Sequence, residues 1–95
     1  MTHDQKPPQT IEQIRSQIDD IDRELVRLLD KRAGLAREIG RAKLIEGHQR
    51  FFDPSRQKQV IERAIEVSNG EFPREAIRNV FVEIMAGCLA REQPP

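Results

Sequence analysis

The chain has 95 residues, and its 16 lysine and arginine residues are balanced by 16 aspartate and glutamate residues. A chain of this length forms one small domain with a modest core. The balanced charge argues against a nucleic-acid-binding module that depends on bulk positive charge. The single cysteine, Cys88, excludes an intramolecular disulfide, and His3 and His48 are too far apart in the sequence to indicate a metal site.

The N-terminal segment, residues 1–9, is polar and contains two prolines. We expect it to be a disordered lead, and it lacks the apolar core of a signal peptide. No apolar run approaches the roughly 18 residues that a membrane-spanning helix needs. We therefore expect a cytoplasmic protein that binds neither membranes nor nucleic acids.

A long helix is predicted for residues 10–46. Thr10 and Gln13 suit a capping box at its start, and Gly47 supplies a stop at its end. Apolar residues recur at alternating steps of three and four, which is typical of a long helix with a buried seam. They are Ile11, Ile14, Ile18, Ile21, Leu25, Leu28, Leu35, Ile39 and Ala42.

The length of this helix exceeds the width of a compact domain. About 36 residues rising 1.5 Å each extend roughly 54 Å. A compact globule of this chain length has a diameter of only about 32 Å. A single chain would therefore leave part of the seam in water, and the simplest partner is a second copy of the chain.

Two shorter helices are predicted to follow. Asp53 suits an N-cap and Pro54 a first helical position, so the second helix covers residues 54–68 and ends before Asn69 and Gly70. Pro73 can open a third helix. Its apolar face is made of Ile77, Val80, Phe81, Ile84, Met85, Cys88 and Leu89. Since no strand pattern occurs, the predicted fold is all-α, with one very long and two shorter helices.

Arg32 interrupts the apolar seam of the long helix between Leu28 and Leu35. A charge at such a position needs an anion, a hydrogen-bond partner or water, because burial of a lone charge costs several kcal/mol or more. Lys43 lies on the same face three turns later. The simpler alternatives are an ion pair between Arg32 and an acid of the second helix, and a Lys43 side chain that extends to solvent at the helix end.

Three other polar positions are ambiguous on the pattern alone. Arg15 lies about 25 Å from Arg32 along the helix, so the two can contact one small ligand only across an antiparallel dimer; otherwise Arg15 is a surface residue. Arg56 falls in the first helical turn, where a bound anion would offset its unfavourable dipole interaction. Glu92 extends the apolar stripe of the third helix, or else belongs to a frayed and solvated end. Cys88, on the same stripe, is more typical of a small buried residue than of a nucleophile.

Several short segments, in this order and spacing, carry a resemblance to a known family. They are Ile14-Arg15, Ile18-Asp19-Asp20-Ile21-Asp22, Leu28-Leu29-Asp30-Lys31-Arg32, Ile39-Gly40-Arg41-Ala42-Lys43, Phe52-Asp53-Pro54-Ser55-Arg56 and Phe81-Val82-Glu83-Ile84-Met85-Ala86-Gly87-Cys88. Residues 10–93 resemble the all-helical chorismate mutases, especially the N-terminal domains of bifunctional chorismate mutase–prephenate dehydratases. Residues 94–95 would then be a tail or a truncated linker.

The resemblance implies an intertwined homodimer whose long first helices each span both subunits. It implies two cofactor-free and metal-free active sites that convert chorismate to prephenate by a Claisen rearrangement, on the route to phenylalanine and tyrosine. Such a pericyclic reaction needs the reactive conformer held in place and the charge on the breaking C–O bond stabilised, without a nucleophile. A cationic pocket without a catalytic triad fits that requirement.

The resemblance also implies roles for individual residues. Arg15 from one subunit and Arg32 from the other would clamp the two carboxylates of chorismate, with Arg56 adding to carboxylate binding. Lys43 would contact a carboxylate and the ether oxygen. The remaining implied contacts are Asp53 and Gln57 with the ring hydroxyl, Cys88 near a carboxylate, and Glu92 with the ether oxygen.

Three positions depart from the family pattern. Gln57 replaces a frequent glutamate, and Phe52 replaces a basic residue of some members. Glu92 stands where some members have glutamine, and only a protonated carboxyl can donate a hydrogen bond to the ether oxygen. We therefore hypothesise that Glu92 acts in its protonated form and that activity falls as pH rises.

Two other functions remain open at this point. An isochorismate–pyruvate lyase could use a similar cationic pocket on the same fold, and a helical dimerisation module would need no activity. The ending Glu92-Gln93-Pro94-Pro95 looks like an interdomain linker. One interpretation is that the chain is a domain of a fusion with a prephenate dehydratase or another domain of the pathway, and the other is a free-standing mutase.

Overall fold

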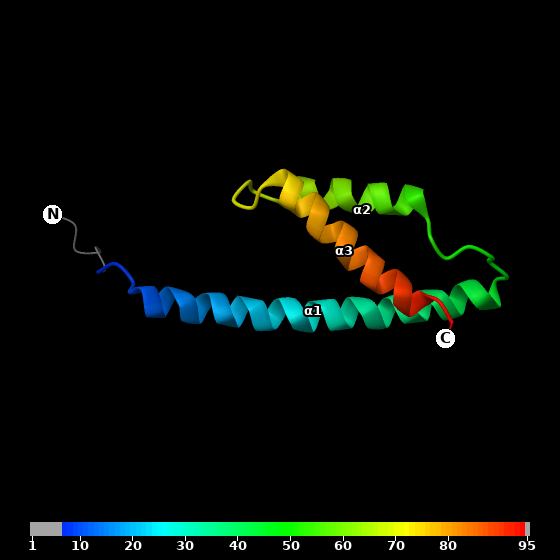
Figure 1. The fold of residues 1–95 in the computed structure, drawn as a ribbon, viewed down its shortest axis with the longest axis horizontal. Helices are drawn as coiled ribbons and strands as arrows, with labels where there is room; N and C mark the ends of the chain where they lie inside the picture. The colour runs from blue at the N-terminus through cyan, green and yellow to red at the C-terminus, as the bar shows by residue number, and fades with distance from the viewer. Residues whose placement is uncertain (1–6, 95) are drawn as a thin grey trace.

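The computed structural model describes residues 7–94, and its helices are α1 (Ile11–Ile45), α2 (Pro54–Val67) and α3 (Arg74–Glu92). Figure 1 shows one long helix beneath two shorter ones. The prediction of an all-α chain with one very long helix is confirmed. Of the predicted disordered lead, residues 1–6 lie outside the described part, as does Pro95 of the tail, while residues 7–9 are exposed and not helical.

Side-chain caps account for where α1 and α2 begin. The Thr10 hydroxyl accepts from the Gln13 backbone N–H at 3.1 Å, and the Gln13 side chain accepts from the Thr10 N–H at 2.9 Å. Asp53 Oδ1 accepts from the Arg56 N–H at 3.1 Å, with Pro54 at the first helical position. Each cap satisfies a backbone N–H that has no partner within the helix.

The helix ends are set by the chain's turns. After α1, Gly47 adopts a φ of 79°, which a glycine tolerates without strain. α2 ends at Val67, one residue before the predicted limit, because Ser68 is already extended. Gly70 follows with a φ of 96°. α3 begins at Arg74, so that Pro73 is the residue before the helix rather than its first member.

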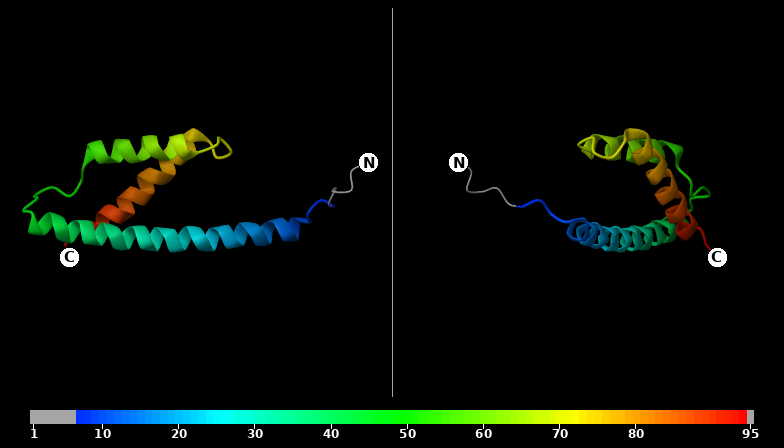
Figure 2. Two further views of the ribbon diagram at one scale, coloured as in Figure 1. Left: turned by 180° about the vertical axis from the view of Figure 1, so that it is seen from behind. Right: turned by 60° about the vertical axis from the view of Figure 1, so that its left-hand side comes forward.

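α3 joins the other two helices into one unit. It crosses from α2 to the C-terminal half of α1 and packs against both, whereas within residues 7–94 α1 and α2 do not pack against each other directly. α2 runs back above α1 in the opposite direction (Figures 1 and 2). Cavities lie between α1 and the pair of helices α2 and α3.

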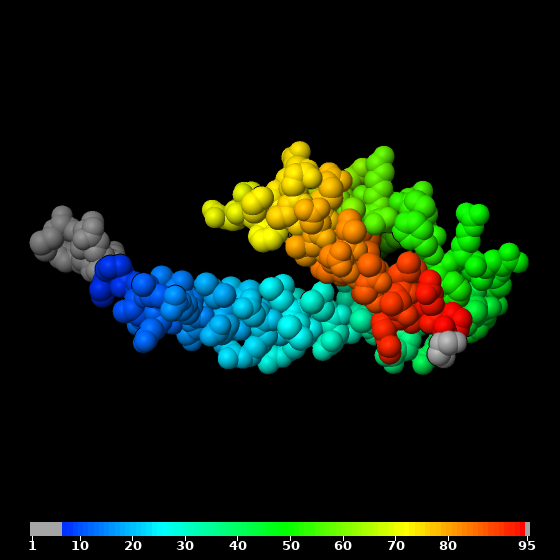
Figure 3. Space-filling view, viewed as in Figure 1, coloured from blue at the N-terminus to red at the C-terminus, as the bar shows by residue number. Residues whose placement is uncertain are grey.

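The core of the single chain is thin and lies only where α3 meets its neighbours. The buried side chains among the described residues are Ala36, Ile61, Ile77 and Cys88, each at most 9% exposed. The N-terminal half of α1 extends beyond the other helices (Figure 3). Its seam residues are between 43% and 67% exposed, namely Ile11, Ile14, Ile18, Ile21, Leu25 and Leu28.

The overall dimensions agree with this incomplete burial. The chain measures 68 × 23 × 19 Å and has a radius of gyration of 18.7 Å, against about 12 Å for a compact chain of its length. Its accessible surface is 8366 Å², whereas a compact protein of this mass exposes about 5,600 Å². None of the helices within residues 7–94 combines the length and apolar character needed to cross a membrane.

Candidate active site

A cavity of about 570 Å³ lies between the C-terminal half of α1, the start of α2 and the end of α3. Its volume is in the range of small-molecule sites. Seven of the residues predicted to form a site line it: Arg32, Lys43, Asp53, Arg56, Gln57, Cys88 and Glu92. Residues from three helices and one connector, up to 60 positions apart in the chain, therefore face one volume.

A short ion pair joins α1 to α3 at one end of this cavity. Lys43 Nζ donates to Glu92 Oε1 at 2.7 Å and to the Phe51 carbonyl oxygen at 2.5 Å. It also lies 5.9 Å from the centre of the Phe51 ring. The side chains of Lys43 and Glu92 are only 20% and 15% exposed. The alternatives of a Lys43 extended to solvent and a frayed, solvated end at Glu92 are therefore wrong.

Gly40 allows α3 to reach this position. A Cβ on Gly40 would collide with the Glu92 carbonyl oxygen and would lie 2.8 Å from the Glu92 Cα. Because no side chain fits there, the last turn of α3 rests directly on the backbone of α1. With Ala36, the other buried residue of α1, Gly40 makes a smooth surface. That close approach brings the Glu92 carboxylate to the Lys43 ammonium.

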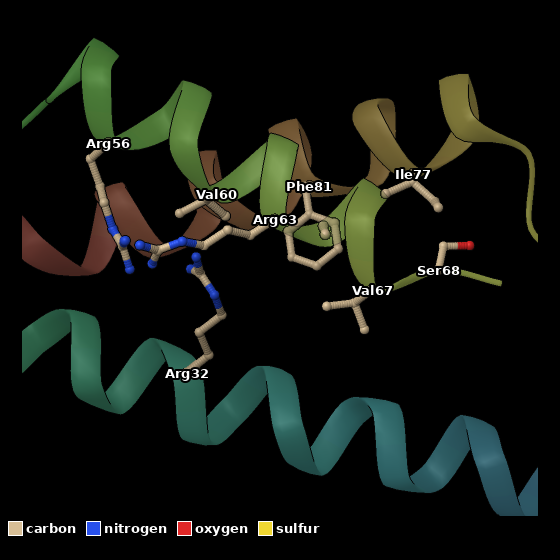
Figure 4. A pocket seen from close by; sticks show the side chains of 9 residues that line it. Arg32, Arg56, Val60, Arg63, Val67, Ser68, Ile77 and Phe81 are labelled. Carbon is tan, nitrogen blue, oxygen red and sulfur yellow. The ribbon is translucent and has the colours of Figure 1, made fainter. Parts of the chain in front are cut away.

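Arg32 enters the cavity from α1 without an acidic partner among residues 7–94. It is half-buried, and none of the ion pairs among the described residues includes it. The alternative of an ion pair with an acid of α2 is therefore wrong. Its guanidinium group points toward α2 and lies near that of Arg56 (Figure 4). Two cations that face one cavity and form no ion pair within the described residues make a site for an anion.

The first turn of α2 supplies the polar groups opposite α1. One carboxylate oxygen of Asp53 is engaged by the Arg56 backbone N–H as the helix cap. The Arg56 side chain donates to Gln59 Oε1 at 2.9 Å. Gln57 is half-buried in the cavity wall. This turn therefore offers a guanidinium, an amide and a fixed carboxylate close to one another along the chain.

Two predicted residues are placed differently from the others. Arg15 is exposed and lies outside the cavity, about 25 Å along α1 from Arg32. Arg15 can therefore act at a site of this kind only in another copy of the chain. Cys88 lines the cavity as a buried residue, 6% exposed, in keeping with a small wall side chain.

Reasoning from the sequence missed two contributors to the region. The Phe51 carbonyl, which accepts from Lys43, belongs to an irregular connector that periodicity does not describe. Arg63 points from α2 toward Arg32 and Arg56 (Figure 4). Since it follows Arg56 by seven residues, the two share a helix face, and that spacing was the available signal.

The fold and the cavity define a class of protein: an all-helical chain whose long first helix and short second helix hold cationic side chains around a cavity of the size that small molecules occupy. The chain matches the chorismate mutase type II family over residues 14–93 and belongs to that family.

Proteins of established name are similar to this chain. It is 36% identical over 87 residues to a bifunctional chorismate mutase/prephenate dehydratase of Aquifex aeolicus, covering 87% of this chain. It is 38% identical over 90 residues to the protein of the same name from Neisseria gonorrhoeae, covering 90% of this chain. The chain spans 24% of the length of each of these two curated relatives.

A solved structure has the same fold. Chorismate mutase (form II) from Thermus thermophilus superposes with a TM-score of 0.81 at 35% sequence identity. The match covers 86% of this chain and 92% of that one. The three-helix architecture is thus that of a chorismate mutase.

Proposed function

We propose that this chain is a chorismate mutase, which converts chorismate to prephenate by a Claisen rearrangement in the biosynthesis of phenylalanine and tyrosine. The observation that carries the proposal is the cavity lined by Arg32 and Arg56, neither of which has an acidic partner within residues 7–94, and by the ion pair of Lys43 and Glu92. Chorismate carries two carboxylates. Bidentate arginines would hold such a dianion in one orientation.

The reaction is intramolecular, so binding and electrostatics suffice to accelerate it. Holding the two carboxylates would favour the compact conformer in which the bond-forming atoms are close. Negative charge develops on the ether oxygen as the C–O bond breaks, and a fixed donor there would stabilise the transition state. Lys43 is suited to that task because its ammonium is held by the Phe51 carbonyl and Glu92. Asp53 and Gln57 would receive the ring hydroxyl, and Cys88 would line the wall beside a carboxylate.

The active form that we propose is an intertwined homodimer with two shared sites. The cavity is open on one side, since three of its apolar wall residues, Leu35, Ile39 and Phe52, are each more than half exposed. The seam of the N-terminal half of α1 is exposed as well. In an antiparallel pair, the apolar seam of each chain would pack against the other subunit. Arg15 of one chain would then enter the cavity that contains Arg32 of the other chain. A dry, cationic site would result.

The decisive experiment is the loss of chorismate absorbance when the purified chain is added, with prephenate identified as the product. Arg32→Ala and Lys43→Ala are each expected to lower kcat/KM by about 10²–10³-fold, the usual effect of removing one transition-state contact. Lys58→Ala is the matched control, because Lys58 is exposed on α2 and does not line the cavity.

Two other outcomes would point to different functions. Release of pyruvate from isochorismate, without turnover of chorismate, would identify an isochorismate–pyruvate lyase. No turnover of either substrate, and no thermal shift with a dicarboxylate transition-state mimic, would indicate a dimerisation module, because a ligand that binds only the folded state raises its stability.

The setting of the activity is proposed from the same observations. The relatives named above join a mutase to a prephenate dehydratase, and a fusion of this mutase to such a domain is proposed on their account. The cytoplasm is the proposed compartment.

A further inference from the structure

A second cavity of about 530 Å³ adjoins the candidate active site between α1 and the α2–α3 pair. The two volumes share Arg32, Arg56 and Val60. One part of the second cavity contains three guanidinium groups, those of Arg32, Arg56 and Arg63, which point toward one another (Figure 4). The remainder is largely apolar and is lined by Val60, Ala64, Val67, Ile77 and Phe81, with Ser68 at its edge.

Arg63 is the surplus charge in this cluster. In residues 7–94 no carboxylate lies within 4.0 Å of any of the three guanidinium groups. Three like charges at close range repel one another. A dianionic substrate in the active site would balance Arg32 and Arg56. Arg63 is exposed and has no ion-pair partner within residues 7–94, so its guanidinium group is available to a carboxylate of another chain.

The exposed N-terminal half of α1 carries a carboxylate that is available to pair with an arginine of another chain. Asp22 is exposed and takes part in none of the ion pairs within the described residues. It follows Arg15 by seven residues, so the two lie on one flank of the apolar seam, about 20° short of two full turns and roughly 10.5 Å apart. When this seam packs against a partner chain, Arg15 and Asp22 therefore face the partner on the same side of the helix.

The spacing on α2 is the same. Arg63 follows Arg56 by seven residues and lies at the same distance along its helix. Because α2 runs opposite to α1 (Figure 1), the α1 helix of an antiparallel second copy would run parallel to α2. When the partner subunit's Arg15 is level with Arg56, the partner subunit's Asp22 is therefore level with Arg63.

We propose that Arg63 forms an ion pair with the partner subunit's Asp22, and that this pair sets the register in which Arg15 enters the active site of the other chain. The proposal rests on the homodimer proposed above and adds a specific charged contact to its apolar seam. Ion pairs of this kind select one alignment of helices, because a shift by one heptad would place Arg63 beside the partner subunit's Arg15 or the partner subunit's Leu29.

A charge-exchange experiment in the full chain tests the pair. The dissociation constant of the dimer is measured by analytical ultracentrifugation for the native chain, Asp22→Arg, Arg63→Asp and the double variant that carries both substitutions. Each single variant is expected to weaken the dimer on the order of tenfold or more, because it leaves like charges facing each other. The double variant is expected to regain most of that loss, since it restores both pairs with reversed polarity. Asp30→Arg combined with Arg63→Asp is the matched control and should regain nothing, because Asp30 faces away from the seam.

The possible failures are distinct. If the native chain is dimeric but the two substitutions act additively, the ion pair is wrong and the homodimer stands. If Arg63→Asp raises KM without weakening the dimer, Arg63 binds substrate instead of Asp22, and the proposal is overturned. If the native chain is monomeric at the concentrations used for activity, the homodimer and the pair are both wrong.

Discussion

At the scale of single residues, the position of Glu92 in the cavity raises the question of whether its carboxyl group can donate a hydrogen bond to the substrate. It accepts a 2.7 Å hydrogen bond from Lys43, and both groups would face the ether oxygen of chorismate. That oxygen can only accept a hydrogen bond, so Lys43 can serve it as an ammonium, whereas Glu92 can serve it only with a proton. As a carboxylate, Glu92 would instead repel the charge that develops there.

The group at position 92 should therefore affect the rate of the chemical step. Glu92→Gln places a permanent donor at the same position and is expected to keep kcat at or above the native value. Glu92→Ala removes both the donor and the partner of Lys43, and it is expected to lower kcat by about 10²-fold. The measurement is kcat of the three proteins at one pH.

A control for this experiment separates the ether oxygen from the loss of any carboxylate in the cavity. Asp53→Asn removes another carboxylate of the cavity but is not expected to raise kcat. A loss of kcat in Glu92→Gln as large as the loss in Glu92→Ala would contradict the role of residue 92 as a donor to the ether oxygen.

The same residues show where reasoning from the sequence is sufficient. Arg32 and Lys43 were placed on one face of a helix by periodicity, and they do line one cavity. Periodicity describes only the direction of a side chain from its own helix. It could not decide between Glu92 in a solvated end and Glu92 paired with Lys43, because that choice depends on where α3 meets α1.

At the scale of elements, that meeting point is set by Gly40. The backbone of Glu92 lies where a side chain at position 40 would begin. Gly40→Ala is expected to lower the free energy of unfolding by about 1–3 kcal/mol, the usual cost of overpacking, and to displace Glu92 from Lys43. Both the thermal unfolding temperature, measured at fixed protein concentration, and kcat should decrease.

Gly34→Ala is the matched control on the same helix. No atom lies within 4 Å of a Cβ built at Gly34, so alanine there should stabilise the helix by about 0.5–1 kcal/mol. Equal effects of the two substitutions would contradict the special role of the contact between Gly40 and Glu92.

The helices themselves were predictable because their limits are coded locally. The capping box of Thr10 and Gln13, the Asp53-Pro54 start and the two glycine turns lie within a few residues of the limits they set. The crossing of α3 over α1 could not be predicted in this way. It depends on a contact between residues 40 and 92, which are distant in the sequence and of which one is a glycine with no side chain to leave a pattern.

At the scale of the whole molecule, the two halves of α1 have different environments. Its C-terminal half, with Ala36 and Gly40 buried, carries α3 and one wall of the cavity. Its N-terminal half keeps an apolar seam in contact with solvent. Burial of apolar surface contributes roughly 25 cal/mol per Å². Dimerisation through this half of α1 would therefore add stability that the small core of the single chain does not supply.

If the active sites are shared between subunits, two inactive variants should restore activity when they are combined in one dimer. In the proposed dimer each site takes Arg15 from one chain and Arg32 from the other, so Arg15→Ala and Arg32→Ala are each expected to be nearly inactive. In a heterodimer of the two variants, one site receives both substitutions and the other receives neither. Random assortment of equal amounts makes about half of the dimers heterodimers, so activity should recover to roughly a quarter of the native value. The measurement is chorismate turnover after the variants are unfolded and refolded together, with each variant refolded alone as the control. Mixtures no more active than their separate components would mean that each chain builds its site from its own residues, and that Arg15 has no part in it.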